Sequence, residues 1–173
     1  MKIILFDLGN TLEDVEREKL LPGARKTLKT IQAMRDAQGH APVLALVSDF
    51  GEIPATPEQI QASQEEYFDI LRGLGIQSFF KPLTQRVTLS TEVGAAKPSR
   101  KIFEAVIDKV GGGGSFQNTL FITENKSHVD AARALGIRAI HFKGPGEASG
   151  DINRLVDLIP LVRDFSKAVQ LGD

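Results

Sequence analysis

The stretch Ile3-Ile-Leu-Phe-Asp-Leu-Gly-Asn-Thr-Leu12 decides how this sequence folds. Ile3 to Phe6 form a continuous apolar run of strand length with no alternating polar face, which is typical of a strand covered on both sides. The run stops at Asp7, and the Gly-Asn pair that follows favours a tight turn. The sequence therefore predicts a buried strand that delivers a carboxylate to its carboxyl end.

Four further apolar runs have the same character and alternate with helical stretches along the chain. The predicted strands are Val43 to Val47, Val87 to Leu89, Leu120 to Ile122 and Arg138 to Phe142, and the predicted helices are Ala24 to Ala37, Thr56 to Leu74, Pro98 to Val110, Val129 to Leu135 and Asp151 to Ala168. This alternation predicts an α/β fold, a Rossmann-like open three-layer sandwich with a mainly parallel central sheet. Ligands of such sheets lie beyond the carboxyl ends of the strands.

Length and composition narrow the class of protein. A chain of 173 residues predicts a single domain over residues 1–173. With 21 basic and 22 acidic side chains, it offers no charge footprint for nucleic acid or an anionic membrane. No apolar stretch approaches the roughly 20 residues that span a bilayer, and we expect a cytoplasmic chain without a cleaved leader. The absence of cysteine excludes disulfides, thiolate nucleophiles and Cys-based zinc sites.

Four polar side chains stand at predicted strand ends or just before a helix: Asp7, Ser48, Lys97 and Glu124. Taken singly, each also fits an ordinary turn residue or a solvated side chain. Together they supply a carboxylate nucleophile, a hydroxyl, a cation and an acidic metal ligand, the groups that phosphoryl transfer requires. We therefore expect these four side chains to converge on one cleft.

The segments that carry these residues resemble, in the same order, the motifs of the haloacid dehalogenase (HAD) superfamily. The most specific pieces are FDLGNTL at residues 6–12, STEVGAAKPSRKIFEAV at residues 90–106 and FITENKSHVDAARALG at residues 121–136. The resemblance covers roughly residues 1–142. It implies a phosphatase that uses Mg²⁺ and an aspartyl-phosphate intermediate.

The resemblance also implies a role for each matching residue. Asp7 is the expected nucleophile, and Ser48 and Lys97 complete the expected catalytic set. The expected Mg²⁺ ligands are Asp7, the carbonyl of Gly9 and Glu124. The expected substrate contacts are Asn10, Thr11 and Asp49.

Three positions depart from the family pattern. Gly9 stands where the family usually has an aspartate that acts as general acid and base, Glu124 stands where an aspartate is usual, and His128 takes a place that is commonly Asp or Asn. An alternative hypothesis is therefore a catalytically impaired domain that binds a phosphorylated ligand or a protein partner. A response-regulator receiver domain is disfavoured, because its phosphorylated aspartate follows the third strand and Asp7 follows the first.

The segments where the family inserts lid domains are short here. Residues 13–21 are few and charged, and residues 51–86 are nearly filled by one predicted helix, so the chain resembles a capless member. An open site excludes water poorly, so we expect a phosphorylated macromolecule or a second copy in a homo-oligomer to cover it. Structural roles are predicted for His40, His141 and the Tyr67-Phe68 pair.

Overall fold

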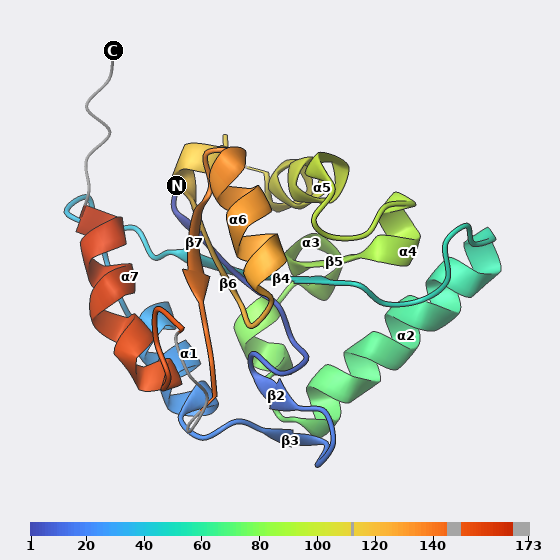
Figure 1. The fold of residues 1–173 in the computed structure, drawn as a ribbon, viewed down its shortest axis with the longest axis horizontal. Coiled ribbons are helices and arrows are strands. Elements are labelled where there is room, and N and C mark those ends of the chain that lie inside the picture. The colour runs from blue at the N-terminus through green and yellow to red at the C-terminus, as the bar shows by residue number, and fades with distance from the viewer. Residues whose placement is uncertain (112, 145–149, 168–173) are drawn as a thin grey trace.

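A five-stranded parallel sheet forms the centre of the computed structural model, which describes residues 1–111, 113–144 and 150–167 (Figure 1). The strand order is β5-β4-β1-β6-β7. Their bounds are β1 Ile3–Phe6, β4 Val43–Ser48, β5 Val87–Leu89, β6 Thr119–Thr123 and β7 Arg138–His141. The prediction of a mainly parallel α/β sheet with Ile3 to Phe6 at its centre is confirmed, because Leu5 pairs with Ala45 on one side and Phe121 on the other.

Helices cover both faces of the sheet, which explains why β1 is apolar at every position. Helices α5 (Arg100–Val110) and α6 (Lys126–Ala134) lie on one face, and α1 (Ala24–Gln32) and α7 (Leu158–Lys167) lie on the other (Figure 1). Ile3 and Leu5 pack in the core beneath α5 and α6, whereas Ile4 and Phe6 pack in the core beneath α1 and α7. Both cores exclude water from the central strand and fix the position of the residue that follows it.

Helix α2 (Pro57–Gly73) begins where the sequence predicts. The Thr56 hydroxyl accepts from the backbone N–H of Gln59, and the Gln59 side chain accepts from the backbone N–H of Thr56, forming a capping box. Tyr67 and Leu71 are the buried residues of this helix. Tyr67 therefore lies in the core as predicted, although its hydroxyl reaches the cleft described below.

Several elements differ from the prediction. Residues 13–21 form a hairpin of β2 (Glu13–Asp14) and β3 (Lys19–Leu20) rather than a plain link. The first helix ends at Gln32, because the Asp36 carboxylate accepts from two later backbone N–H groups and stabilises a turn instead. The closing segment divides into η3 (Leu155–Asp157) and α7, and Ala168 lies outside the described residues. The short elements are η1 (Gln77–Phe80), α3 (Leu83–Arg86), α4 (Ser90–Val93) and η2 (Phe116–Asn118).

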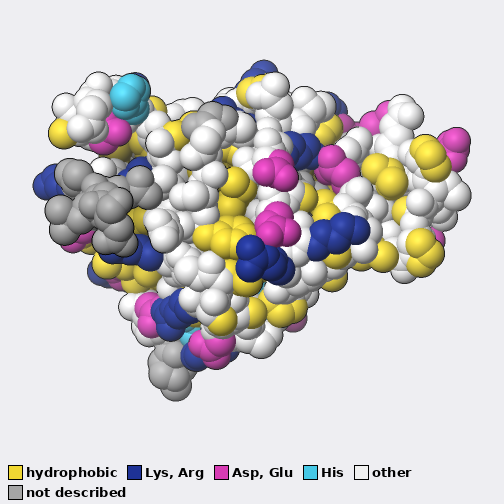
Figure 2. All heavy atoms as spheres, turned by 90° about the horizontal axis from the view of Figure 1, so that it is seen from above, with side chains coloured by type: hydrophobic (Ala, Val, Ile, Leu, Met, Phe, Trp, Pro, Cys, Tyr) yellow, Lys and Arg dark blue, Asp and Glu magenta, His cyan; other side chains and the backbone are white. Residues whose placement is uncertain are grey.

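The surface carries charges of both signs. Lys and Arg side chains lie among Asp and Glu side chains on the face that Figure 2 shows. None of the helices in the described part of the chain combines the length and the apolar character that a bilayer crossing needs.

Candidate active site

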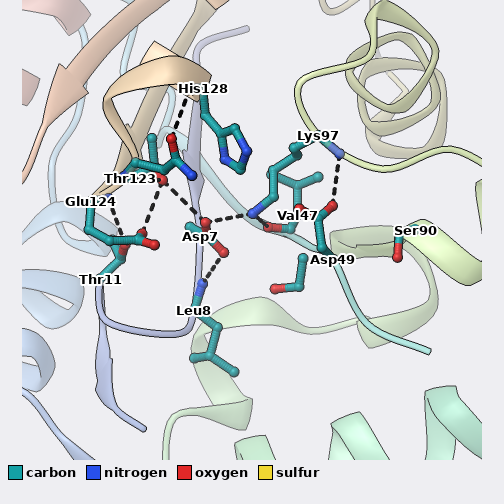
Figure 3. Close-up of polar contacts among 12 residues, drawn as sticks. Asp7, Leu8, Thr11, Val47, Asp49, Ser90, Lys97, Thr123, Glu124 and His128 are labelled. Atoms are coloured by element: carbon teal, nitrogen blue, oxygen red, sulfur yellow. Dashed lines mark hydrogen bonds and ion pairs between the residues drawn. The ribbon is translucent and has the colours of Figure 1, made fainter. Parts of the chain in front are cut away.

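The carboxyl ends of the central strands border a cleft of about 1140 Å³. Asp7 follows β1, Ser48 ends β4, Lys97 precedes α5 and Glu124 follows β6, and all four line this cleft. Figure 3 shows Asp7 with Lys97 on one side and Glu124 on the other. Gly9, Asn10 and Asp49 line it as well. The sequence therefore located the side chains that meet here, while their chemical roles stay predictions.

Asp7 forms an almost fully buried ion pair with Lys97. The Lys97 Nζ lies 2.5 Å from Asp7 Oδ2, and the two side chains are 2% and 11% exposed, respectively. Asp7 Oδ1 accepts from the backbone N–H of Leu8 at 2.9 Å, and Lys97 Nζ also donates to the carbonyl of Val47 at 3.3 Å. Both partners are thus held in one orientation, with the carboxylate at the wall of the cleft.

The pKa of the Asp7 carboxyl is raised above its ordinary value. Burial is the largest cause, and the neighbouring Glu124 carboxylate raises the pKa further. The Lys97 ammonium and the Thr123 hydroxyl act in the opposite direction. Asp7 is therefore a carboxylate whose charge is poorly solvated and depends on its cationic neighbour, as a reactive nucleophile requires.

A turn after β1 presents Asp7 to the cleft. The backbone N–H groups of Thr11 and Leu12 donate to the carbonyl of Leu8 at 3.2 and 2.8 Å. Asn10 adopts a φ of 53°, in the left-handed region that asparagine tolerates better than most residues. The Gly-Asn pair thus forms the tight turn that the sequence predicts.

Two residues expected to contact substrate, Thr11 and Asp49, also form contacts within the protein. The Thr11 side chain is fully buried outside the cleft lining and donates to Glu124 Oε2 at 2.8 Å, so it positions Glu124 and does not face a ligand. Asp49 Oδ1 accepts from the backbone N–H of Lys97 at 2.8 Å, which holds the turn that carries the lysine. Thr11 therefore lies beneath the cleft surface and contacts Glu124, and its role toward a substrate stays a prediction.

Ser48 has a partner that the sequence did not indicate. Its hydroxyl lies 2.6 Å from the hydroxyl of Tyr67, which burial keeps in the neutral form by raising its pKa well above the usual range. Phe50 packs edge-on against the Tyr67 ring at 5.2 Å between centroids. Tyr67 therefore orients the Ser48 hydroxyl, and its only distinguishing signal was that it is the single tyrosine of the chain.

The carboxylate oxygens of Asp7 and Glu124 are ligands that suit a hard divalent cation. The Thr123 hydroxyl lies 3.2 Å from Asp7 Oδ2 and 3.1 Å from Glu124 Oε2, so two carboxylates of the same charge are neighbours. Oxygen ligands of this kind suit Mg²⁺, which usually takes one or two carboxylates and fills its octahedron with water and phosphate. Within the described residues, no group of three or more His, Asp or Glu side chains forms a metal cluster, so backbone oxygen, water and substrate would complete the coordination.

His128 is the third departure, and its side chain also lines the cleft (Figure 3). Its Nδ1 is buried and has no hydrogen-bond partner within the described residues. Burial and the Lys97 ammonium lower the pKa of the imidazole, against the smaller raising effects of Asp49, Asp7 and Glu124. The ring is therefore neutral at neutral pH. His40 and His141, by contrast, lie in an exposed turn and within β7, where His141 Nε2 contacts the carbonyl of Glu124 at 2.9 Å.

The hairpin and α2 form the outer walls of the cleft. Glu13, Val15 and Glu18 line it from the hairpin, and Tyr67 and Ile70 line it from α2. A Cβ added at Gly9 would lie 3.1 Å from Cγ2 of Val15, so the hairpin packs over the position where the family pattern has an aspartate. Sequence reasoning missed these wall residues, since a short charged segment has no periodicity that indicates strands.

Solved structures of HAD-superfamily hydrolases share this fold. A protein named as the HAD-hydrolase YfnB from Bacillus subtilis, in a magnesium-bound form, superposes with a TM-score of 0.70 and 13% identity over 94% of this chain and 98% of that one. A dehalogenase matches with a TM-score of 0.66 and 14% identity over 93% and 96% of the two chains. A HAD phosphatase from Thermococcus onnurineus matches with a TM-score of 0.60 and 15% identity over 94% and 98%.

The fold of this chain is thus the one that these HAD-superfamily structures share. No protein-family model and no curated protein matches the sequence. At identities of 13 to 15% the likeness to these structures extends to the fold. The chemistry has to be argued from the side chains in the cleft.

Proposed function

We propose that the protein is a HAD-type phosphomonoesterase that works through a phosphorylated Asp7. The observation that carries this proposal is the buried Asp7–Lys97 ion pair, which places a carboxylate and a cation together at the cleft wall. Both groups serve a phosphate ester, because the cation neutralises its anionic oxygens and the carboxylate is a nucleophile that can attack its phosphorus. The hydrolases, dehalogenase and phosphatase that share the fold support this class of chemistry.

The residues divide the reaction into two displacements. In the first, a carboxylate oxygen of Asp7 bonds to phosphorus, and the electron pair of the P–O ester bond leaves with the alcohol oxygen, which takes a proton from solvent water. Lys97 and the Ser48 hydroxyl, oriented by Tyr67, stabilise the charge on the phosphoryl oxygens. In the second, water attacks phosphorus and Asp7 is regenerated. Mg²⁺, when held by Asp7, Glu124 and the Gly9 carbonyl, supplies further neutralisation of the phosphate charge.

A second candidate function is binding of a phosphorylated ligand or protein partner without turnover. Gly9 favours it, since this position has no acidic side chain and Val15 packs against it. The two candidates share the ion pair and differ in whether phosphorus ever bonds to Asp7.

A structure with Mg²⁺ and the phosphate mimic trifluoroberyllate separates these candidates. If the protein is a phosphatase, the electron density of trifluoroberyllate should be continuous with an oxygen of Asp7. Density continuous with another residue would show that Asp7 is not the nucleophile. A protein that binds inorganic phosphate but forms no adduct and hydrolyses no phosphate ester would favour the binding candidate.

We also propose that residues 1–173 act as one domain without a cap and that the protein works in the cytoplasm. In this proposal, either a large phosphorylated substrate or a second copy of the chain covers the cleft. The volume of about 1140 Å³ supports a bulky ligand, since pockets for drug-sized molecules are roughly 300–1,000 Å³. The hairpin and α2 contribute residues to the outer walls of the cleft.

The double variant Gly9→Asp, Glu124→Asp should hydrolyse alkyl phosphates about 10²- to 10⁴-fold faster than the parent, because an aspartate at position 9 can protonate the leaving alcohol. The added Cβ requires Val15 to shift by a few tenths of an ångström, which its half-exposed place on the hairpin permits. The gain should be smaller for p-nitrophenyl phosphate, whose leaving group needs no acid. Steady-state phosphate release measures both, with Glu124→Asp alone as the control. A folded, Mg²⁺-binding double variant without any gain would contradict the expectation.

A further inference from the structure

The proposed second displacement lacks an obvious proton acceptor. Water that attacks a phosphorylated Asp7 must lose a proton, and Gly9 has no side chain to accept it. Asp7 is itself the group being released, and Glu124 Oε2 already accepts from Thr11. The acceptor must therefore come from another side chain of the cleft.

We propose that the imidazole of His128 is the base that accepts this proton. The inference rests on the proposed function and adds to it a residue that stands outside the usual acid and base position of the family. His128 lines the same cleft as Asp7, and its ring lies on the side of Asp7 and Lys97 (Figure 3).

The local structure holds the ring in this place. His128 lies in the first turn of α6, where the Asn125 side chain accepts from the backbone N–H groups of Ser127 at 3.0 Å and His128 at 3.4 Å. The next residue, Val129, is fully buried against the sheet, which fixes the direction of this helix face. The backbone that carries the imidazole is thus fixed at the edge of the cleft, which favours a base that acts on a single water.

The His128 side chain has hydrogen-bonding capacity that the described residues leave unused. The Nδ1 of His128 is buried without a partner in the described part of the chain, an arrangement that ordinarily destabilises the fold. Buried polar atoms of this kind call for an explanation such as an ordered water or a catalytic role. Nδ1 has almost no surface open to solvent, so a water beside Asp7 would meet the cleft-lining ring at Nε2.

The surrounding charges suit a base. The charged groups that act on the ring are Lys97 before α5, Asp49 after β4, Asp7 after β1 and Glu124 after β6, and Glu13, Glu18, Glu66 and Asp69 line the outer walls of the cleft. Burial and Lys97 keep the imidazole unprotonated before the reaction, so a nitrogen lone pair is available. The carboxylates then stabilise the imidazolium that forms.

The atoms of the step balance without another reactant. The water oxygen bonds to phosphorus, its proton passes to an imidazole nitrogen, and the P–O bond to Asp7 breaks with its electron pair returning to the carboxylate. The imidazolium then releases the proton to solvent. The products are inorganic phosphate, free Asp7 and neutral His128.

Glu13 is a competing proton acceptor, because its carboxyl also lines the cleft. Burial, followed by Glu18 and Asp14, raises the pKa of its carboxyl. Glu13 lines the outer wall of the cleft from the hairpin, whereas the His128 ring lies toward Asp7 and Lys97 (Figure 3). The geometry therefore favours His128, and Glu13→Gln provides the direct comparison.

The test compares the two displacements in His128→Asn, using p-nitrophenyl phosphate and Mg²⁺ with the full chain. We expect a burst of p-nitrophenol equal to the enzyme present, accumulation of phosphorylated Asp7 in acid-quenched protein by mass spectrometry, and steady turnover lowered about 10²-fold. Added imidazole should restore turnover. In the parent, the steady rate should fall as pH drops through the lowered pKa of His128, while the variant should lack this limb. His40→Asn, in an exposed turn, should behave as the parent.

Each other outcome overturns the proposal. Turnover at the parent's rate in His128→Asn, loss of the burst together with turnover, or accumulation of phosphorylated Asp7 in Glu13→Gln instead would exclude His128 as the base. A parent that forms no phosphorylated Asp7 and releases no phosphate would overturn the proposed function as well, so the two failures are distinct. Thermal unfolding by circular dichroism verifies the fold of each variant, and His128→Gln replaces His128→Asn should the latter fail to fold.

Discussion

Asp7→Asn will lower the hydrolysis of phosphate esters by at least roughly 10³-fold, because a carboxamide cannot form the acyl-phosphate bond of the first displacement. The structure gives the reason for so large an effect. Asp7 is the carboxylate paired with Lys97 at the cleft wall, and the neighbouring Glu124 is engaged by Thr11 and Thr123. Initial rates on p-nitrophenyl phosphate with Mg²⁺ measure the loss.

The matched control for this substitution is Asp130→Asn. Asp130 is an exposed aspartate of α6 that pairs with Lys126 and lies outside the cleft. It should keep the parent's rate. Equal rates for Asp7→Asn and the parent would show that the activity belongs to a contaminant or to another site. Such a result would leave phosphate binding as the function of the Asp7–Lys97 pair.

The sequence was most informative where burial on both faces leaves a simple pattern. Ile3 to Phe6 had to be a central strand, because four consecutive apolar residues need a core on each side. Parallel strands end at one edge of a sheet, so Asp7, Ser48 and Glu124 had to meet once the strands were located. Position along the chain was sufficient for these residues, and no knowledge of side-chain contacts was needed.

Features that depend on hydrogen bonds between distant segments were not predictable in this way. The hairpin of residues 13–20 is charged and has strands of two residues, too short for any periodicity. Thr11 and Tyr67 each act through a hydroxyl that meets a partner far along the chain, Glu124 and Ser48, respectively. The residue types of Thr11 and Tyr67 indicated a turn and a core position, respectively, and the two residues lie there. The residue types did not indicate the hydrogen-bond partner of either hydroxyl.

Lys97→Met will lower the free energy of unfolding by about 3–5 kcal/mol at neutral pH, since removing one partner of a buried ion pair leaves the other charge uncompensated. The Asp7 side chain is 11% exposed and, among the residues that the structure describes, would keep the Leu8 N–H and the Thr123 hydroxyl as donors. Lys101→Met, an exposed lysine of α5, is the matched control and should change stability little. Urea denaturation followed by circular dichroism gives the values.

The loss of stability in Lys97→Met should depend on pH, and the protonation of the Asp7 carboxyl determines in which direction. The pKa of Asp7 is already raised by burial, and without the Lys97 ammonium it rises further. For an acid whose pKa is raised on folding, the stabilising contribution is present below the unfolded pKa of about 3.9 and is lost as pH rises through the folded pKa. The difference between Lys97→Met and the parent should therefore be largest at neutral pH and shrink on acidification. A difference independent of pH would show that lost packing, not charge, causes the instability.

The double variant Asp7→Asn, Lys97→Met completes this thermodynamic cycle. With both charges gone, no uncompensated group remains, and replacing a buried pair by neutral side chains is often neutral or stabilising. We expect the double variant to regain most of the stability that Lys97→Met loses, at every pH, while remaining inactive. If the double variant were as unstable as Lys97→Met, the ion pair would have a role in stabilising the fold. Recovery of stability without activity would instead mean that these two charges are buried together for the chemistry of the cleft.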